Sequence, residues 1–253
     1  MAKKGEQSAR DPVVEALEQV TQSLNATNEL LRSLGTRMPD GGRTPAETGG
    51  DSVPLLADAR FLPSAGPAAA GQDESILRDL AKPHGLEVPM ERLIALRNER
   101  YADSRPRYWG IVNFELHSAK PRLFVFDVVS RTTDSYLCAH GIGSEGPSDD
   151  GFATVFSNKP GSNASSLGIY RCAETYDGKN GYSLRLDGLE PTNSNARSRK
   201  IVVHGADYVS EKFVEKYKRI GRSEGCPALD HKYARAVIDQ LKLGSLLIHW
   251  TPP

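Results

Sequence analysis

One cysteine stands in a local sequence that suits nucleophilic chemistry. Cys226 lies between Gly225 and Pro227 in the segment 221–229. Glycine lets the backbone come close to a substrate, and Pro227 fixes its own φ and predicts that a helix begins after it. A thiol at such a loop-to-helix junction faces backbone N–H groups and a positive helix end, which favour the thiolate. We therefore predict that Cys226 is a nucleophile and that the N–H groups of Gly225 and Cys226 stabilise an oxyanion.

The base expected to serve this thiol lies upstream. His204 ends the apolar run 201–203, which predicts a strand, and Gly205 follows it. A cysteine and a histidine far apart in sequence can form a nucleophile and base when the fold brings them together. An isolated pair of this kind is more often structural, but glycine beside both residues is typical of an exposed site. We predict that His204 and Gly205 belong to the catalytic group, together with Ser223, which would hydrogen-bond the histidine or shape the turn.

Two arginines are candidates for binding an anionic substrate group. Arg222 precedes Ser223, and Arg199 lies shortly before the strand that ends at His204. A guanidinium near the thiol would stabilise the thiolate and could hold a carboxylate through two hydrogen bonds. A structural salt bridge is the competing role for both arginines. His140, which is also followed by a glycine, is a further candidate for the cleft and is equally consistent with a structural place at a strand end.

The other chemistry-bearing residues give no metal or cofactor motif. The three cysteines are odd in number and widely spaced, so neither a zinc site nor a disulfide scaffold is indicated. Cys138 and Cys172 lie in apolar surroundings, which is typical of buried small hydrophobes. His117, His231 and His249 are isolated, without metal-ligand spacing, which favours solvent-facing or core positions. No phosphate loop, HExxH or GxSxG pattern is present, and we expect no metal or organic cofactor.

The segment around Cys226 resembles the signature of bacterial murein L,D-transpeptidases. Residues 223–226 (Ser-Glu-Gly-Cys) are similar to that family's Ser-x-Gly-Cys motif, and His204-Gly205 is similar to its upstream His-Gly element. The closer match is to the branch with Gly-Arg-Ser-x-Gly-Cys-Pro-Ala, where a bulky residue is usual at the position of Glu224. That acid would oppose thiolate formation by its negative charge. The resemblance covers roughly residues 108–250 and includes similar segments at 165–168, 181–189 and 195–199.

The resemblance implies a β-sandwich-like catalytic domain and acyl transfer on peptidoglycan stem peptides. The thiolate of Cys226 would attack the carbonyl that follows the L-centre of diaminopimelate in a tetrapeptide stem, and the terminal D-alanine would leave. The thioester would then pass its acyl group to a stem amine, a free D-amino acid or water, giving a cross-link, exchange or L,D-carboxypeptidase activity. The segment 181–189 adds Tyr182 to the substrate-binding candidates. The place of action implied is the cell wall, in the periplasm or cell envelope.

Hydrophobic periodicity from Tyr108 onward predicts a mainly β core with peripheral helices. Strands are predicted at 109–116, 123–129, 136–140, 165–170, 182–186, 200–204 and 245–250, and helices at 73–80, 88–101, 208–218 and 230–241. The polar, glycine-rich segment 141–166 is too long for an ordinary connection, and long loops in compact domains are usually functional. We expect this segment to form a wall of a substrate groove.

An N-terminal helix and a linker are predicted to precede a catalytic domain at 73–253. Within residues 1–35, apolar residues from 13 to 34 alternate at spacings of four and three, which is a heptad seam. A single helix of about three heptads is marginal in water, so the helix at 12–35 is predicted to associate with itself or a partner, or else to dock on its own domain. The segment 36–72 is rich in Gly, Pro, Ala, Thr and Ser and predicts a flexible linker.

Charge and hydropathy limit the possible partners. The formal net charge of +0 argues against a nucleic-acid-binding protein, which normally has a basic excess. No stretch is long and apolar enough to cross a membrane, and no apolar core of a signal peptide follows the basic start. Because peptidoglycan lies outside the cytoplasm, three routes stay open: a removed or missing signal, export without a classical signal, or delivery by a specialised secretion machine.

Two other functions also stay open. The protein could be an antibacterial effector of L,D-carboxypeptidase type that damages a rival's wall, a reading favoured by the separate helix and linker. It could also be a non-catalytic wall-binding or assembly module, with Glu224 as a sign of decay. The joint presence of Cys226, His204, Arg222 and Ser223 argues against decay.

Overall fold

The computed structural model describes residue 62 and residues 67–253. The helix predicted at 12–35 and most of the linker predicted at 36–72 lie outside the described residues. The helices are α2 (Pro67–Ala81), η1 (Lys82–His84), α3 (Glu87–Arg100), η2 (Ile142–Ser144), α4 (Glu211–Tyr217) and α5 (His231–Leu241). The strands are β1 (Tyr108–Asn113), β2 (Leu123–Asp127), β3 (Thr132–Tyr136), β4 (Gly168–Gly178), β5 (Gly181–Gly188), β6 (Val202–Gly205), β7 (Ala228–Leu229) and β8 (Leu246–Trp250).

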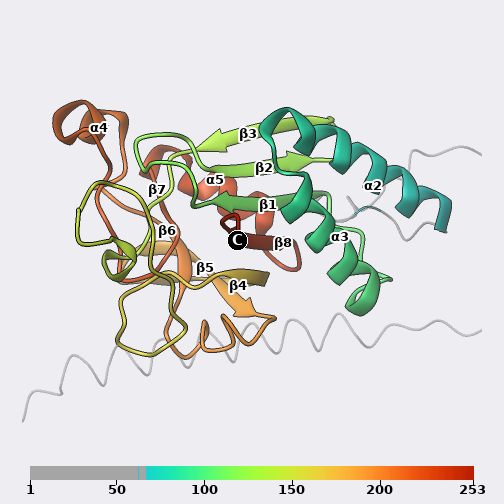
Figure 1. Ribbon diagram of the computed structural model, residues 1–253. Helices are drawn as coiled ribbons and strands as arrows, with labels where there is room; N and C mark the ends of the chain where they lie inside the picture. The colour runs from blue at the N-terminus through green and yellow to red at the C-terminus, as the bar shows by residue number, and fades with distance from the viewer. Residues whose placement is uncertain (1–61, 63–66) are drawn as a thin grey trace, which may run out of the picture. The chain divides into compact units, whose positions relative to one another are not determined.

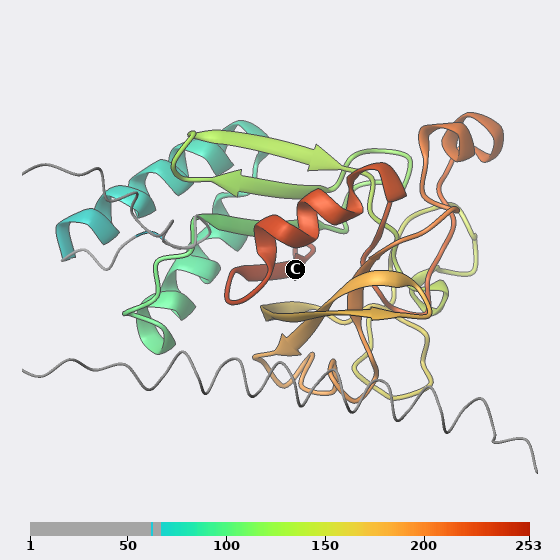
Figure 2. The same ribbon diagram turned by 180° about the vertical axis from the view of Figure 1, so that it is seen from behind.

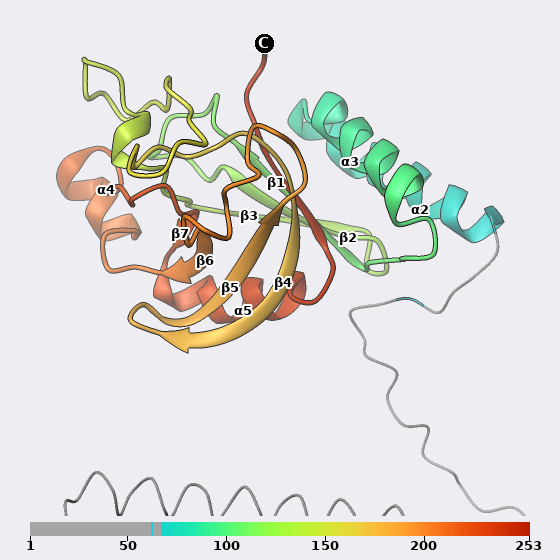
Figure 3. The ribbon, with the colours of Figure 1, turned by 90° about the horizontal axis from the view of Figure 1, so that it is seen from below.

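The described strands form one eight-stranded sheet in the order β3-β2-β1-β8-β4-β5-β6-β7. The strand β8, from the end of the chain, is parallel to β1 and antiparallel to β4, and so joins two antiparallel groups. At the far end of the order, Leu229 of β7 forms a bridge with Cys138, just beyond β3. The sheet therefore curves back on itself towards a barrel, and the strong curvature of the β4–β5 hairpin is visible from below (Figure 3).

Within the described residues, the two largest hydrophobic clusters lie on opposite faces of this sheet. Side chains alternate along β8, so Leu246 and Ile248 pack in the layer that contains Leu77 and Leu93 of the helices α2 and α3. Leu247 packs on the other face, in the layer that contains α5. Figure 2 shows α5 on the side of the sheet away from α2 and α3. The central strands β1 and β8 are apolar because both their faces are covered. The expected mainly β fold with peripheral helices is confirmed.

The helix α2 begins at Pro67, earlier than the start predicted at 73. The first turns of α2 have the small-residue composition that predicts a linker, but Leu77 and Ala81 further along are fully buried against α3 and the sheet. Tertiary packing therefore decides the structure of this segment where composition does not. None of the helices within the described residues is long and apolar enough to cross a membrane.

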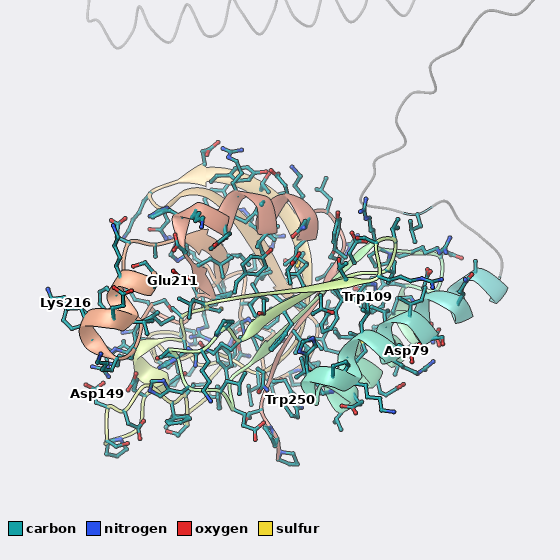
Figure 4. All side chains as sticks on the ribbon, turned by 90° about the horizontal axis from the view of Figure 1, so that it is seen from above. Asp79, Trp109, Asp149, Glu211, Lys216 and Trp250 are labelled. Atoms are coloured by element: carbon teal, nitrogen blue, oxygen red, sulfur yellow. The ribbon has the colours of Figure 1, made fainter. Side chains whose placement is uncertain are left out.

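The end of the sheet near β6 and β7 lies away from α2 and α3. Figure 1 shows the helix α4 at this end, and Figure 4 shows Asp149 on the same side as Glu211 and Lys216 of α4, with Asp79 of α2 on the opposite side. The strands β6 and β7 are parallel, with His204 opposite Ala228 and Gly205 opposite Leu229. This register is what brings the segment around Cys226 beside the end of β6.

Candidate active site

The structure places Cys226 and His204 on the lining of one cavity. The cavity has a volume of about 1100 Å³, and we call it the larger cavity. The backbone N–H of Val202, at the start of β6, donates to Cys226 Sγ at 3.5 Å, and Sγ in turn donates to the carbonyl of Lys200 at 3.6 Å. The thiol is thus held against the strand that carries the histidine. Among the other predicted residues, Gly205, Ser223, Arg222 and Tyr182 also line this cavity.

Ser223 shapes the turn before the cysteine. Its hydroxyl donates to the carbonyl of Cys226 at 2.7 Å and accepts the N–H of Gly225 at 3.1 Å. Gly225 has a φ of +114°, and a Cβ there would lie 2.7 Å from the carbonyl oxygen of Ala164. Only glycine fits this backbone. Since the Gly225 N–H is bound to Ser223, the structure does not present it to an oxyanion as the sequence predicted.

Pro227 does not open a helix. The residues after it form the short strand β7, and α5 begins only at His231, after Asp230, whose side chain accepts the N–H of Lys232 at 2.9 Å. Cys226 therefore does not lie at a loop-to-helix junction, the arrangement from which help by a helix dipole was predicted. The prediction of a loop-to-helix junction was wrong because β6 offers an edge with which residues 228–229 pair.

The local electrostatics favour a neutral thiol and a neutral imidazole. Burial raises the pKa of Cys226 above its usual value; the Val202 N–H and Arg199 oppose this rise, and Glu224 adds to it. Burial lowers the pKa of His204, which is 5% exposed; the carbonyl of Gly205 opposes this fall, and His231 adds to it. Nδ1 of His204 lies 2.8 Å from the Gly205 carbonyl. A carbonyl only accepts, so Nδ1 carries the proton and Nε2 is left as the basic nitrogen.

Arg222 is held by acids of the long loop. Its guanidinium pairs with Asp149 and lies 3.7 Å from a carboxylate oxygen of Glu145. Arg219 pairs with the same two acids, at 2.8 Å and 3.5 Å. The structural salt bridge named as the competing role for Arg222 is thus present. It fastens the segment 219–223 to the loop 141–166, whose residues 142 and 163 line the larger cavity.

Arg199 is fastened to the same loop through neutral groups. It donates to the carbonyls of Ser157 at 2.8 Å and Ala164 at 2.6 Å. Arg199 lines a second cavity of about 730 Å³, which we call the smaller cavity, and Cys226 lies on the lining of both cavities. Its positive charge helps to lower the pKa of Cys226 against the effect of burial. Arg199 therefore stays a candidate for acting on the thiol and its substrate.

His140 lies in the interior and lines neither cavity. Its ring is fully buried, with Nδ1 2.6 Å from a guanidinium nitrogen of Arg122 and Nε2 3.1 Å from Glu145. Burial and the charge of Arg122 lower its pKa to about 3, so the ring is neutral. Its carbonyl accepts the N–H of Ser223 at 2.9 Å. His140 thus holds the turn that precedes Cys226 through its backbone carbonyl. Its buried position does not suit contact with a substrate.

Tyr182 lines the larger cavity, and its hydroxyl is occupied. The hydroxyl donates to Asp239 at 2.7 Å and accepts from Lys242 at 3.1 Å. The guanidinium of Arg235 lies over the ring, 4.3 Å from its centre. With Arg235 over its ring, the substrate-binding role of Tyr182 stays a prediction.

His231 is a residue of the larger cavity that sequence reasoning missed. It is the first residue of α5, and it pairs with Asp207 at 3.2 Å. Its ring packs so closely on Gly205 that a Cβ at that position would clash with it. The only sequence signal was its place just after the nucleophile segment, because its proximity to His204 depends on the β6–β7 register. Within the described residues, no group of three or more His, Cys, Asp or Glu side chains is arranged to hold a metal.

Comparison with solved structures finds L,D-transpeptidases at low identity. The L,D-transpeptidase from Mycobacterium smegmatis is similar over 57% of this chain and 58% of its own, with 12% identity and a TM-score of 0.35. L,D-transpeptidase 1 from Mycobacterium tuberculosis is similar over 57% and 62%, with 12% identity and a TM-score of 0.32. An L,D-transpeptidase from Xylanimonas cellulosilytica is similar over 74% and 95%, with 11% identity and a TM-score of 0.31. The matched region spans less than two thirds of the two mycobacterial chains.

Comparison of the sequence with protein families identifies the family of this chain. A search of curated proteins gave no match. A sequence profile of the L,D-transpeptidase catalytic domain, however, matches residues 82–250, which is more than half of the chain and includes β1 to β8 with both candidate catalytic residues. The chain therefore belongs to the L,D-transpeptidase catalytic domain family.

Proposed function

We propose that the protein is a cysteine acyltransferase that acts on peptidoglycan stem peptides, with Cys226 as the nucleophile and His204 as the base. The observation that carries this proposal is the shared cavity of Cys226 and His204, in which Nε2 of His204 is the free basic nitrogen. The other two cysteines are unsuited to this role. Cys138 and Cys172 are fully buried, and burial raises the pKa of both, that of Cys138 to about 12.

The first half of the reaction forms a thioester. As Cys226 Sγ attacks the carbonyl that follows the L-centre of diaminopimelate, Nε2 of His204 accepts the thiol proton. Because both groups are neutral at rest, proton transfer accompanies the attack and no preformed ion pair is required. The Gly225 N–H is occupied, so we assign the N–H of Cys226 as the candidate oxyanion donor. The C–N bond then breaks, and His204 returns its proton to the leaving D-alanine amine.

The second half transfers the acyl group to an acceptor. His204 takes a proton from the incoming amine or water, which attacks the thioester carbon, and Sγ leaves with that proton. A stem amine yields a cross-link, a D-amino acid an exchanged stem, and water a tripeptide. The proposed place of action is the cell envelope, where peptidoglycan lies.

The proposal is tested by turnover of a disaccharide-tetrapeptide, followed by mass spectrometry of the products with and without D-methionine. We expect release of D-alanine by the wild-type protein and none by Cys226→Ala or His204→Ala. Cys172→Ala is the matched control, since it removes a buried thiol outside the site, and it should retain turnover wherever it folds. Turnover by Cys226→Ala equal to that of the wild type would contradict the proposal. The product masses identify the acceptor.

A further inference from the structure

The smaller cavity has an excess of positive charge beside the thiol. Its lining contains one acidic side chain, Glu224, and four cationic side chains, which are Lys179, Arg185, Arg199 and Lys200. Cys226 lies on the same lining, and its Sγ donates to the backbone carbonyl of Lys200. An anion that entered this cavity would therefore lie next to the nucleophile.

Most of this charge is not neutralised by other side chains. Arg185 pairs with Glu174 at 3.2 Å, but the hydrogen bonds of Arg199 go to neutral carbonyl and hydroxyl oxygens. Within residues 67–253, no carboxylate forms an ion pair with Lys179 or Lys200. A cation whose partners are neutral keeps its attraction for an anionic ligand, and the walls of a cavity strengthen that attraction.

The larger cavity is less positive. Its Arg222 is already paired with Asp149 and Glu145. The acids Asp207 and Glu224 on its lining also oppose its other two cations, Arg235 and Lys179, the second of which lines both cavities. An anionic group of a substrate bound at Cys226 is therefore drawn towards the smaller cavity. A cationic amine of an acceptor meets less repulsion in the larger cavity.

We propose that the smaller cavity is a carboxylate-binding subsite, in which Lys179 and Lys200 hold a carboxylate of the stem peptide while Cys226 attacks the neighbouring carbonyl. This assignment deepens the proposed function and rests on it. A tetrapeptide stem offers two such groups: the carboxylate of the terminal D-alanine and the free carboxylate of diaminopimelate. Both would bind through the same charge-assisted hydrogen bonds.

A first experiment measures the charge at the thiol without any substrate. Iodoacetate and iodoacetamide are similar in size and alkylate a thiolate by the same displacement of iodide, but only iodoacetate is anionic. Because Cys138 and Cys172 are fully buried, alkylation of the native protein reports on Cys226. The variant carries Lys179→Met and Lys200→Met. The control is Lys212→Met, which removes an exposed lysine of α4 that lines neither cavity.

We expect the ratio of the iodoacetate rate to the iodoacetamide rate to fall about fivefold in the double variant, after allowance for solvent screening. The ratio should not change in Lys212→Met. The iodoacetamide rate also shows whether the double variant keeps an accessible, folded site. A ratio in the double variant equal to that of the wild type would overturn the assignment.

A second experiment identifies which carboxylate is bound. Three tetrapeptide stems are compared: unmodified, amidated at the C-terminus, and amidated on diaminopimelate. Amidation of the bound group should lower kcat/KM of the wild type about fivefold and abolish the difference between wild type and double variant. An equal loss by the double variant on all three stems would overturn the subsite. Absence of turnover on every stem would instead contradict the proposed function, and the alkylation ratio would still decide the charge assignment.

Discussion

Replacing Ser223 with alanine tests whether this residue builds the nucleophile turn. Its hydroxyl connects the Cys226 carbonyl, at 2.7 Å, with the Gly225 N–H, at 3.1 Å. The residue is 7% exposed, so alanine leaves both backbone groups unpaired with little access to water. A net hydrogen bond contributes about 1 kcal/mol, and an unsatisfied buried group costs about 1–3 kcal/mol. We expect the free energy of unfolding to fall by about 2–4 kcal/mol.

The same substitution should also reduce activity, because Cys226 loses its fixed position. A displacement of about 1 Å can cost on the order of a hundredfold, so we expect kcat/KM to fall about 10- to 100-fold. Urea unfolding gives the stability, and D-alanine release against pH gives the activity. Ser210→Ala is the matched control: its hydroxyl accepts the N–H of Phe213 at 3.2 Å at the start of α4, outside the site. This control should lose about 1 kcal/mol of stability and keep its activity.

A direct hydrogen bond from Ser223 to His204 would give a different result. In that case Ser223→Ala would leave the stability unchanged and shift the acid limb of kcat/KM against pH, which would contradict the role assigned to Ser223. We expect the opposite, with lower stability and an unshifted acid limb, since the hydroxyl is bound on both sides by the backbone of its own turn.

Further predictions concern the titrating groups. Burial raises the pKa of Cys226 above that of an ordinary thiol, so its rate of alkylation by iodoacetamide should keep rising with pH after the rate of free cysteine has levelled off; a plateau at the same pH as free cysteine would contradict this. Glu224→Gln removes a charge that raises this pKa and should speed alkylation at a fixed pH, whereas an unchanged rate would show that Glu224 does not act on the thiol. His231 lowers the pKa of His204, so His231→Gln should move the acid limb of kcat/KM to higher pH, and no movement would contradict the coupling. The pKa of His140 falls from 6.5 to about 3 on folding, so the unfolded state binds the proton more readily and stability is lost as pH falls through this window. His140→Gln should lose less stability between pH 6.5 and pH 4 in urea unfolding, and an equal loss would argue against a neutral buried ring.

The sequence was most informative where the chemistry is local. Hydrophobic periodicity predicted strands at 109–116 and 245–250, which overlap β1 and β8, and the helix predicted at 230–241 is α5. Glycine beside Cys226 marked a position that only glycine can occupy, as the φ of +114° at Gly225 shows. These features depend on neighbours in the chain, which a sequence displays directly.

The sequence was least informative where partners lie far apart. The pairing of Arg222 with Asp149 and the contact of His231 with Gly205 depend on how strands and loops pack, and no spacing in the chain encodes them. Residues 228–229, which follow Pro227, form the strand β7 and do not open the helix, because β6 supplies a pairing edge. His140 has the same His-Gly pattern as His204, but one ring is enclosed by Arg122 and Glu145 while the other lines a cavity.

The most direct test of the central claim is the mass of the intact protein during a single turnover. The protein is mixed with a stoichiometric amount of disaccharide-tetrapeptide, quenched in acid within the first turnover, and then digested for peptide mapping. We predict an adduct equal to the substrate minus D-alanine, located on the peptide that contains Cys226, with no adduct in Cys226→Ala. Free D-alanine formed without an adduct, or an adduct located on another residue, would contradict the assignment of Cys226 as the nucleophile.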